Sequence, residues 1–170
     1  MSDVLARWNS LPFDEAADEI LACCGSKAWA RGLAASRPIH DEAALLTACD
    51  EVSKHLQEGD WLEAFRSHPR IGEFGSPSSA LSRSAEWSSA EQQAVVAAGE
   101  QIKAALMEGN RAYEERFNRV FIVCATGRPA LEILEILRRR LRNDDPAELQ
   151  EAAEQQRQIA NLRLKKWLSS

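Results

Sequence analysis

Glycine and proline are both scarce in this chain of 170 residues, which contains 8 and 6 of them. This scarcity excludes a fibrous or low-complexity protein, because the repeats of such proteins need one or both in quantity. Aromatic residues make up only 6% of the chain, and β-branched residues are sparse beside alanine, leucine and glutamate. The composition argues against a β-sandwich or barrel and favours helices.

Cysteine pairs and long apolar runs are missing as well. The four cysteines, Cys23, Cys24, Cys49 and Cys124, form no Cys-x-x-Cys motif, which argues against a zinc knuckle or a disulfide framework. The longest apolar run, residues 120–125, is far shorter than the roughly 20 residues that span a membrane, and no apolar leader opens the chain. We therefore expect a cytoplasmic protein that uses neither a membrane nor a metal.

Basic charge is not in excess, since the formal net charge is −5. An acidic chain is poorly suited to contacting phosphate backbones, so we expect no nucleic-acid partner. One basic run, Arg138-Arg139-Arg140 with Arg142, falls in a helical pattern. We predict that it forms a solvated helix face rather than a binding patch.

Helical periodicity is what the sequence does contain. Ser2, Asp14, Ser26 and Asp60 can each cap a helix, Gly25 can end one, and apolar residues recur at helical spacing from Asp41 to Leu56. The chain shows no internal repeat and no linker long enough to separate domains. We predict an all-α fold, with residues 1–170 as a single-domain bundle of about eight helices and no sheet.

Periodicity stops over residues 68–87, which are rich in serine, glycine and proline. We predict a long loop there, and loops of that length in compact domains are usually functional. Ser88 followed by Glu91 matches a capping box, which predicts one long helix over residues 88–117. Residues 120–125 indicate a short, buried, extended segment. Pro129 and Asp145 then begin the last two helices.

Three polar side chains each allow a structural and a functional interpretation. His68 opens the long loop, and Pro69 restrains its backbone, so the imidazole is either a catalytic group or a buried structural histidine. Glu91 falls on the core-facing stripe of the predicted 88–117 helix, as a site residue or as half of the capping box. Arg163 falls in the middle of the apolar face of the last helix.

A buried arginine keeps its charge and needs an anionic partner. For Arg163 that partner is either Glu91, in a structural ion pair, or an anionic ligand. Together with His68, these groups could hold a small carboxylate substrate and move a proton. No set of metal ligands, phosphate-binding loop or serine nucleophile motif accompanies them, and Cys124 lies in an apolar run that disfavours a thiolate.

An ordered set of motifs resembles one known family over nearly the whole chain. The family is 2-oxo-4-hydroxy-4-carboxy-5-ureidoimidazoline (OHCU) decarboxylase, the last enzyme of the oxidative route from urate to allantoin. The matching motifs are Cys23-Cys24-Gly25-Ser26 with Trp29, Arg37-Pro38, His68-Pro69-Arg70-Ile71-Gly72, Ser88-x-x-Glu91-Gln92, Tyr113-x-x-x-Phe117, Phe121-Ile122-Val123-Cys124-Ala125, Arg142-Asn143-Asp144 and Ile159-x-x-Leu162-Arg163-Leu164.

The resemblance implies an all-helical, cofactor-free and commonly homodimeric enzyme. It implies decarboxylation of the small anionic OHCU to (S)-allantoin and CO₂, with His68, Glu91 and Arg163 as catalytic residues. His68 is the implied general acid/base, and Arg163 holds anionic oxygen of the substrate. The implied substrate-binding residues are Pro69, Ser88, Ser89, Ala90, Glu91, Gln92, Phe121, Ile122, Val123, Cys124 and Ala125, the last five acting largely through their backbone.

Two alternatives stay open from the residues alone. One is a non-catalytic helical module that binds a small molecule or acts as an adaptor, with Arg163 and Glu91 as a core ion pair. The other is a different small-molecule lyase or hydrolase on the same scaffold. The sequence also departs from the family after Phe117, where many members have glycine and this chain has Asn118. Because asparagine tolerates a left-handed backbone, we expect the turn to survive.

Overall fold

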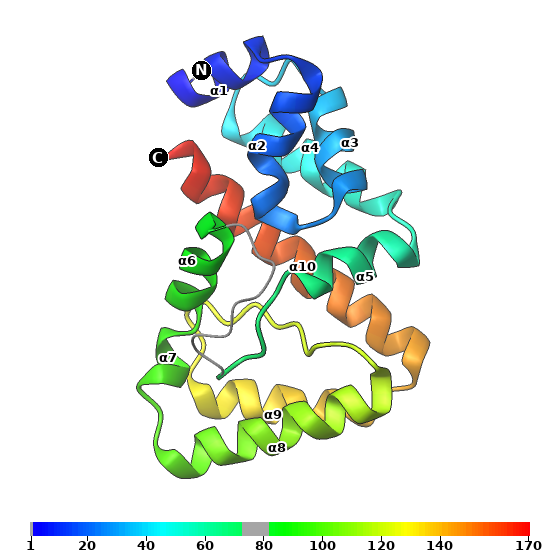
Figure 1. Ribbon diagram of the computed structural model, residues 1–170, viewed down its shortest axis with the longest axis vertical. Coiled ribbons are helices and arrows are strands. Elements are labelled where there is room, and N and C mark those ends of the chain that lie inside the picture. Colours follow the sequence, from blue (N-terminus) through cyan, green and yellow to red (C-terminus); the bar gives the residue numbers. More distant parts are fainter. Residues whose placement is uncertain (1, 73–81) are drawn as a thin grey trace. The chain divides into compact units, whose positions relative to one another are not determined.

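The computed structural model describes residues 2–72 and 82–170 (Figure 1). These residues contain ten helices and no strand, so the predicted all-α class is confirmed, while the predicted count of about eight helices is slightly low. The chain divides into two compact units. The first comprises Met1–Ala64 with Gln156–Ser170, and the second Phe65–Gln155. The single domain over residues 1–170 stays a prediction.

The first unit contains α1 (Asp3–Ser10), α2 (Phe13–Cys24), α3 (Lys27–Ala35), α4 (Glu42–Lys54), most of α5 (Glu58–Arg66) and the end of α10 (Asp145–Leu168). The predicted caps at Ser2 and Ser26 are confirmed, whereas Asp14 and Asp60 lie inside the first turns of α2 and α5 and are not the caps predicted there. The hydroxyls of Ser2 and Ser26 accept hydrogen bonds from the N–H groups of the third residue along, as does the carboxylate of Asp41. Gly25 ends α2 with a φ of 86°, a conformation that glycine adopts at no steric cost.

Three tryptophans fill the core of the first unit. Trp8, Trp29 and Trp167 are each 1% exposed or less, and the rings of Trp8 and Trp167 meet edge to face at 5.6 Å. Such pairs stabilise a core beyond the area that they bury. Within this unit α2 packs on α3, and α3 on α4.

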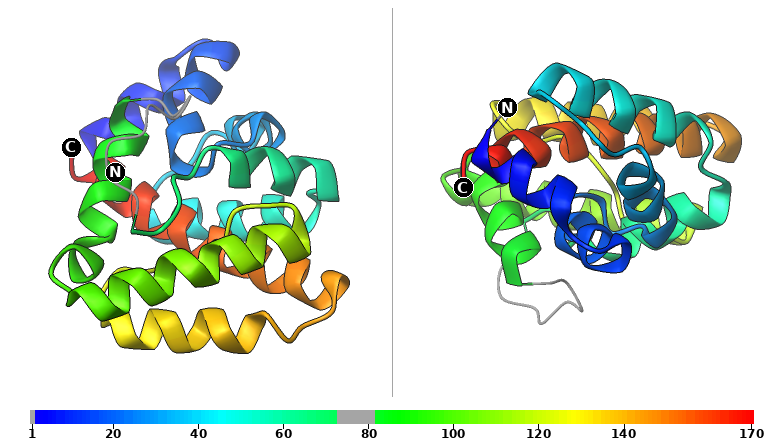
Figure 2. Two further views of the ribbon diagram at one scale, coloured as in Figure 1. Left: turned by 60° about the horizontal axis from the view of Figure 1, so that its bottom comes forward. Right: turned by 90° about the horizontal axis from the view of Figure 1, so that it is seen from above.

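The second unit contains α6 (Ser82–Glu91), α7 (Gln93–Val96), α8 (Glu100–Phe117) and α9 (Ala130–Arg140), followed by the start of α10. Helices α8 and α9 lie side by side along their length (Figures 1 and 2). Gly109 lies where they meet, and a Cβ there would come within 2.5 Å of Leu137. The apolar core of this unit is formed by Ile71, Val95, Leu106, Tyr113, Phe117, Phe121, Val123, Ala125, Ala130, Ile133, Leu134 and Leu137.

The prediction of one helix over residues 88–117 is wrong. The chain forms the end of α6, then α7, then α8, and Gly99 interrupts it in an extended conformation as the N-cap of α8. Glycine loses more entropy in a helix than other residues, so the break costs little at this position. Glu91 therefore ends a helix rather than beginning one, and Ser88 is not a cap but a buried residue inside α6.

The prediction of a loop over residues 68–87 is also wrong where it covers residues 82–87, which are helical. Ser84 and Ser88 are 3% and 4% exposed and stand four residues apart, so they lie on one buried face of α6. Packing of these small side chains outweighs the weak helix propensity of serine. Residues 73–81 of the predicted loop lie outside the described residues.

At the far end of α8, Asn118 adopts the left-handed conformation with a φ of 52°, and its N–H donates to the carbonyl of Glu114. The expectation that asparagine preserves this turn is confirmed.

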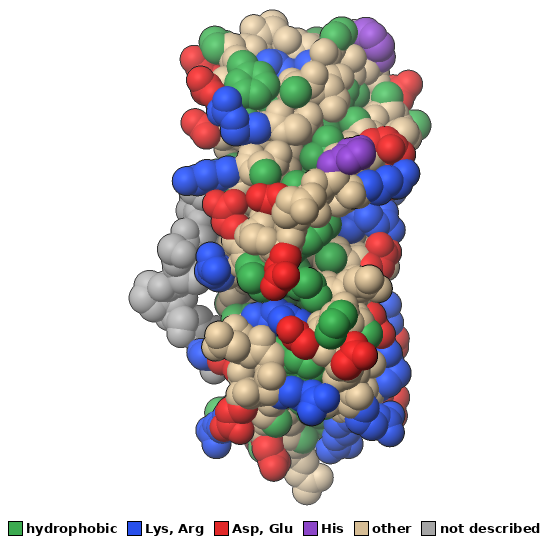
Figure 3. Space-filling model, turned by 90° about the vertical axis from the view of Figure 1, so that its right-hand side faces the viewer, with side chains coloured by type: hydrophobic (Ala, Val, Ile, Leu, Met, Phe, Trp, Pro, Cys, Tyr) green, Lys and Arg blue, Asp and Glu red, His purple; other side chains and the backbone are tan. Residues whose placement is uncertain are grey.

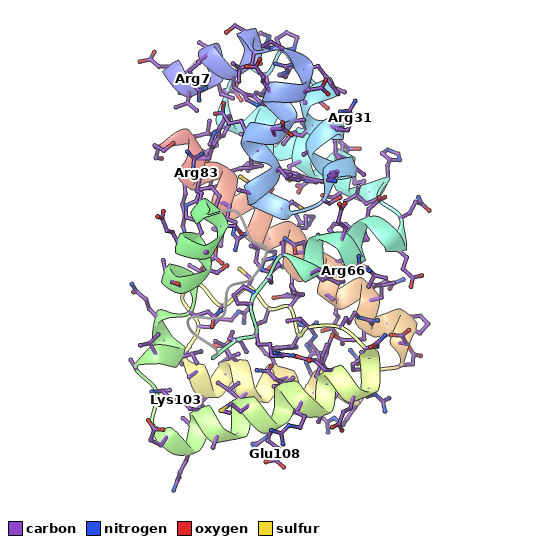
Figure 4. The ribbon with its side chains drawn as sticks, viewed as in Figure 1. Arg7, Arg31, Arg66, Arg83, Lys103 and Glu108 are labelled. Atoms are coloured by element: carbon purple, nitrogen blue, oxygen red, sulfur yellow. The ribbon has the colours of Figure 1, made fainter. Side chains whose placement is uncertain are left out.

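Lys103 and Glu108 project outward from α8 (Figure 4). On the face drawn in Figure 3, basic and acidic side chains are interspersed. None of the described helices is both long and apolar enough to cross a membrane.

Candidate active site

A cavity of about 350 Å³ lies within the second unit. One side of it is formed by Ala90 and Glu91 at the end of α6 and by Gln93 and Ala94 of α7. The other side is formed by residues 125–129, which lead into α9. The charged side chains lining the cavity are those of Glu91 and Arg128, of opposite sign, so it can take a small polar molecule that carries both anionic oxygen and N–H groups.

Two buried amides hold the end of the His68–Gly72 motif, one from the junction of α6 and α7 and one from α8. Gln92 is 7% exposed, and its Oε1 accepts a hydrogen bond from the N–H of Gly72 at 2.8 Å. The Nδ2 of Asn110 donates to the carbonyl of Ile71, also at 2.8 Å. Gly72 has a φ of 86°, which explains why glycine stands there. The sequence did not indicate this tie, and the predicted contact of Gln92 with substrate stays a prediction.

His68 lies just beyond α5 and is half-buried, as is Pro69. Its backbone N–H donates to the carbonyl of Phe65 at 3.1 Å, which continues the last turn of the helix. Two residues further on, the guanidinium of Arg70 pairs with the carboxylate of Glu114 in α8. The backbone around His68 is thus fixed on both sides of the imidazole.

The predicted buried segment over residues 120–125 is confirmed as non-helical, and residues 121–125 are all buried. Its side chains alternate. Phe121, Val123 and Ala125 belong to the apolar core of the second unit, whereas Ile122 and Cys124 do not. This period of two is typical of an extended backbone.

Side chains hold the backbone of this segment at residues 122 and 124. Arg140 Nη1 donates to the carbonyl of Ile122 at 2.6 Å. The N–H of Cys124 donates to Gln155 Oε1 at 2.9 Å, and Arg128 Nε donates to the carbonyl of Cys124 at 3.0 Å. The same Arg128 pairs with Glu132 of α9. Arg128 therefore connects the cavity wall to the extended segment.

Arg140 corrects the prediction that residues 138–140 form a solvated face, because it is 0% exposed. Its Nε and Nη2 both donate to Glu148, which is also 0% exposed. The hydroxyl of Tyr113 and the amide of Asn143 donate to the same carboxylate. Burial, and then the bond to this carboxylate, raise the pKa of Tyr113 well above its usual value. The sequence analysis did not predict this buried network of Arg140, Glu148, Tyr113 and Asn143.

Arg163 belongs to the first unit and is 0% exposed, so its predicted inward orientation is confirmed. Its Nη1 donates to the carbonyl of Ala22 at 3.2 Å. Cys24 lies close enough for the guanidinium charge to act on it, but burial dominates and raises the pKa of that thiol. Whether Arg163 serves an anionic ligand or pairs with Glu91 stays a prediction.

The structure brings together only some of the predicted residues. Ala90, Glu91 and Ala125 line the cavity. Ser88 and Gln92 are buried beside it in sequence, Ser89 is exposed, and Phe121, Ile122, Val123 and Cys124 are buried in the extended segment. Sequence reasoning missed the cavity residues Gln93, Ala94, Thr126, Gly127, Arg128 and Pro129. For Gly127 and Arg128 the sequence did contain a signal, since a glycine and a basic residue follow the apolar segment almost at once.

Acidic, histidine and cysteine side chains are the groups that could hold a metal ion. In residues 2–72 and 82–170, no three of them gather so as to hold a metal ion. The absence of a cofactor stays a prediction.

Comparison with known proteins places this chain in a family. The sequence model described as OHCU decarboxylase matches residues 9–165. The chain is 36% identical over 152 residues to the "Uric acid degradation bifunctional protein TTL" of Arabidopsis thaliana, a match covering 89% of this chain and 47% of the relative. The chain thus spans about half the length of this curated relative.

Two solved structures share the fold. A crystal structure of OHCU decarboxylase in the presence of (S)-allantoin is 31% identical, with a TM-score of 0.75, over 90% of this chain and 99% of the other. A crystal structure of (S)-allantoin synthase, 18% identical with a TM-score of 0.70, covers 96% of this chain and 53% of its own; at that identity the likeness shows the fold alone.

Proposed function

Because the chain belongs to the OHCU decarboxylase family, we propose that it decarboxylates OHCU to (S)-allantoin and CO₂, the last step of urate oxidation. The observation that carries the proposal is the family match over residues 9–165. The cavity that contains Glu91, together with the half-buried His68 on its fixed backbone, supports it.

The substrate supplies its own electron sink, so the chemistry needs no cofactor. The C–C bond to the carboxylate breaks, CO₂ leaves, and the electron pair flows into the neighbouring C=N bond, whose nitrogen takes up a proton. The resulting enol then loses its hydroxyl proton while the former imine carbon gains a proton on one face, which gives one enantiomer. The enzyme has to orient the ring, move these protons and select the face.

We assign these tasks to residues of the chain. His68 acts as general acid/base on the hydroxyl proton, and Arg163 holds anionic oxygen of the substrate. Glu91 accepts hydrogen bonds from the ureido and ring N–H groups, while Gln92, whose amide oxygen already binds Gly72, fixes the Ala90–Glu91 end of α6. The extended segment over residues 121–125 binds the ring through its backbone.

The replacement His68→Asn tests the proposal, because asparagine is similar in size but cannot transfer the proton. We expect stereoselective turnover to fall by about 10²–10⁴-fold. The assay follows the circular dichroism of allantoin formed from freshly made OHCU, since spontaneous decay also releases CO₂. His40→Asn, at an exposed histidine, is the matched control and should keep full activity.

Three outcomes have different meanings. Full activity in folded His68→Asn would contradict the role of His68. Absence of turnover by the wild-type protein would contradict the proposed reaction and favour the non-catalytic binding module. Loss of activity after dialysis against EDTA, restored by a divalent metal, would contradict the cofactor-free mechanism.

We further propose that the protein is a homodimer in the cytoplasm. The resemblance to the family supports the dimer. All four cysteines are buried and free, which suits a reducing compartment. Sedimentation equilibrium of the purified chain tests the dimer directly.

A further inference from the structure

The backbone of the extended segment over residues 121–125 is buried in a unit that otherwise consists of helices and loops. Buried backbone N–H and C=O groups need hydrogen-bond partners, and an extended chain finds them in a neighbouring strand. Among the described residues there is no strand. The partners are instead side chains of α9, of α10 and of the loop between the segment and α9, acting on residues 122 and 124.

In an extended backbone, the N–H and C=O groups of alternate residues leave on the same edge. The bonds to Ile122 and Cys124 therefore hold one edge of the segment. The groups of Phe121 and Val123 leave on the opposite edge, as do those of Ala125, whose carbonyl already accepts from the N–H of Arg128 at 3.0 Å. Which edge is held decides which groups a ligand can meet.

Arg140 is unusually well fixed for this task. Two of its N–H groups are bound by the buried carboxylate of Glu148, and its guanidinium carbon lies 4.7 Å from the centre of the Phe121 ring. The remaining Nη1 is thereby aimed at the carbonyl of Ile122. A planar guanidinium can serve two acceptors in this way, whereas an ammonium group cannot reproduce the geometry.

We infer that Arg140 and Gln155 are positioning residues for the reaction, which act by holding one edge of residues 121–125 so that the other edge faces the substrate. The inference rests on the proposed function, in which this segment binds the ring through its backbone. Releasing the held edge lets the segment turn, so the bound ring is displaced from the proton donor. Turnover and face selection then suffer more than substrate affinity.

Gln155 offers the cleaner test because it is only half-buried. Gln155→Met keeps the shape but removes the acceptor for the Cys124 N–H, and Gln155→Glu keeps an acceptor oxygen. We expect Gln155→Met to lower kcat by about 10- to 100-fold and to reduce the enantiomeric excess of allantoin, with little change in KM. Gln155→Glu should retain most of both. Gln150→Met, on the exposed side of α10, is the matched control.

Arg140→Lys is the second variant, with Arg139→Lys on the same helix as its control. We expect Arg140→Lys to show the same pattern as Gln155→Met, a fall in kcat and in enantiomeric excess with KM nearly constant. If Arg140→Lys does not fold, the result for Gln155→Met decides alone. Unchanged kcat and enantiomeric excess in folded Gln155→Met would overturn the inference. Absence of wild-type turnover would instead overturn the proposed function, and the inference with it.

Discussion

The buried carboxylate of Glu148 is the point at which a single substitution should affect stability most. Its Oε1 accepts from the hydroxyl of Tyr113 and from two N–H groups of Arg140, and its Oε2 accepts from Asn143. Glu148→Gln can still offer one oxygen. Its new NH₂ group, however, meets the amide donor of Asn143, and the charge of Arg140 stays buried without an anion at Oε1.

The size of the effect follows from burial. Arg140 and Glu148 are both 0% exposed, and removing one member of a buried ion pair typically costs about 3–5 kcal/mol. In a protein of this length each kcal/mol lowers the melting temperature by about 2–4 °C, so we expect Glu148→Gln to melt about 6–20 °C below the wild type. Urea unfolding measures the same loss as a lower midpoint with an unchanged m value.

The exposed pair between the same two helices provides the control. Arg139 and Glu151 meet through two hydrogen bonds of 2.8 and 2.9 Å, but their side chains are 50% and 37% exposed. Exposed pairs contribute up to about 1 kcal/mol, so Arg139→Gln should lower the melting temperature by less than about 4 °C. Equal losses in Glu148→Gln and Arg139→Gln would refute the reasoning from burial.

Three further predictions concern backbone, packing and pH. Gly109→Ala should cost about 1–3 kcal/mol in urea unfolding, because its Cβ would clash with Leu137, whereas Gly59→Ala meets nothing within 4 Å and should stabilise by up to about 1 kcal/mol. Asn118→Gly should be neutral or stabilising, while Asn118→Val should cost about 1–2 kcal/mol, since valine resists a φ of 52°; a neutral valine variant would contradict this. The hydrogen bonds from Arg139 lower the pKa of Glu151, so its stabilisation is present above the ordinary pKa of a glutamate and is lost as pH falls through the lowered value. Wild type should therefore exceed Glu151→Gln in stability at pH 7 and lose that lead in acid, and a lead that persisted at pH 2 would contradict the assignment.

Local interactions made much of the fold predictable. The caps at Ser2 and Ser26 and the left-handed turns at Gly25 and Asn118 depend on residues within four positions in the chain, so the sequence contains all of their determinants. The same is true of the segment over residues 120–125, whose apolar run demands burial.

The predictions for residues 82–91 were wrong because tertiary contacts, rather than local preferences, decide the structure there. The serines of α6 favour turns by themselves, yet Ser84 and Ser88 are buried by the fold around them. The capping-box pattern at Ser88 and Glu91 was a coincidence of spacing, because the helix around it had already begun at Ser82. The cavity could not be predicted either, since it depends on residues 125–129 lying opposite the end of α6.

Arg140 and Arg163 show how the same rule succeeded in one place and was not applied in another. Arg163 was placed inside because it interrupts an apolar face, and it is buried. The run of three arginines predicts an exposed Arg140, although this residue follows the buried Ile133 and Leu137 at helical spacing. Helical spacing predicts the burial of each residue separately, whereas a run of charges describes only the average exposure of a stretch. The spacing is therefore the better guide to the burial of Arg140.

A buried cation then requires a buried anion, and Glu148 satisfies that requirement for Arg140 from the first turn of α10. The two N–H groups committed to Glu148, with the third on Ile122, use the guanidinium to fix protein backbone. A guanidinium committed in this way is suited to positioning a site rather than to binding substrate. For that reason the substitutions at Arg140 should alter turnover and face selection, while anion affinity should respond to Arg163.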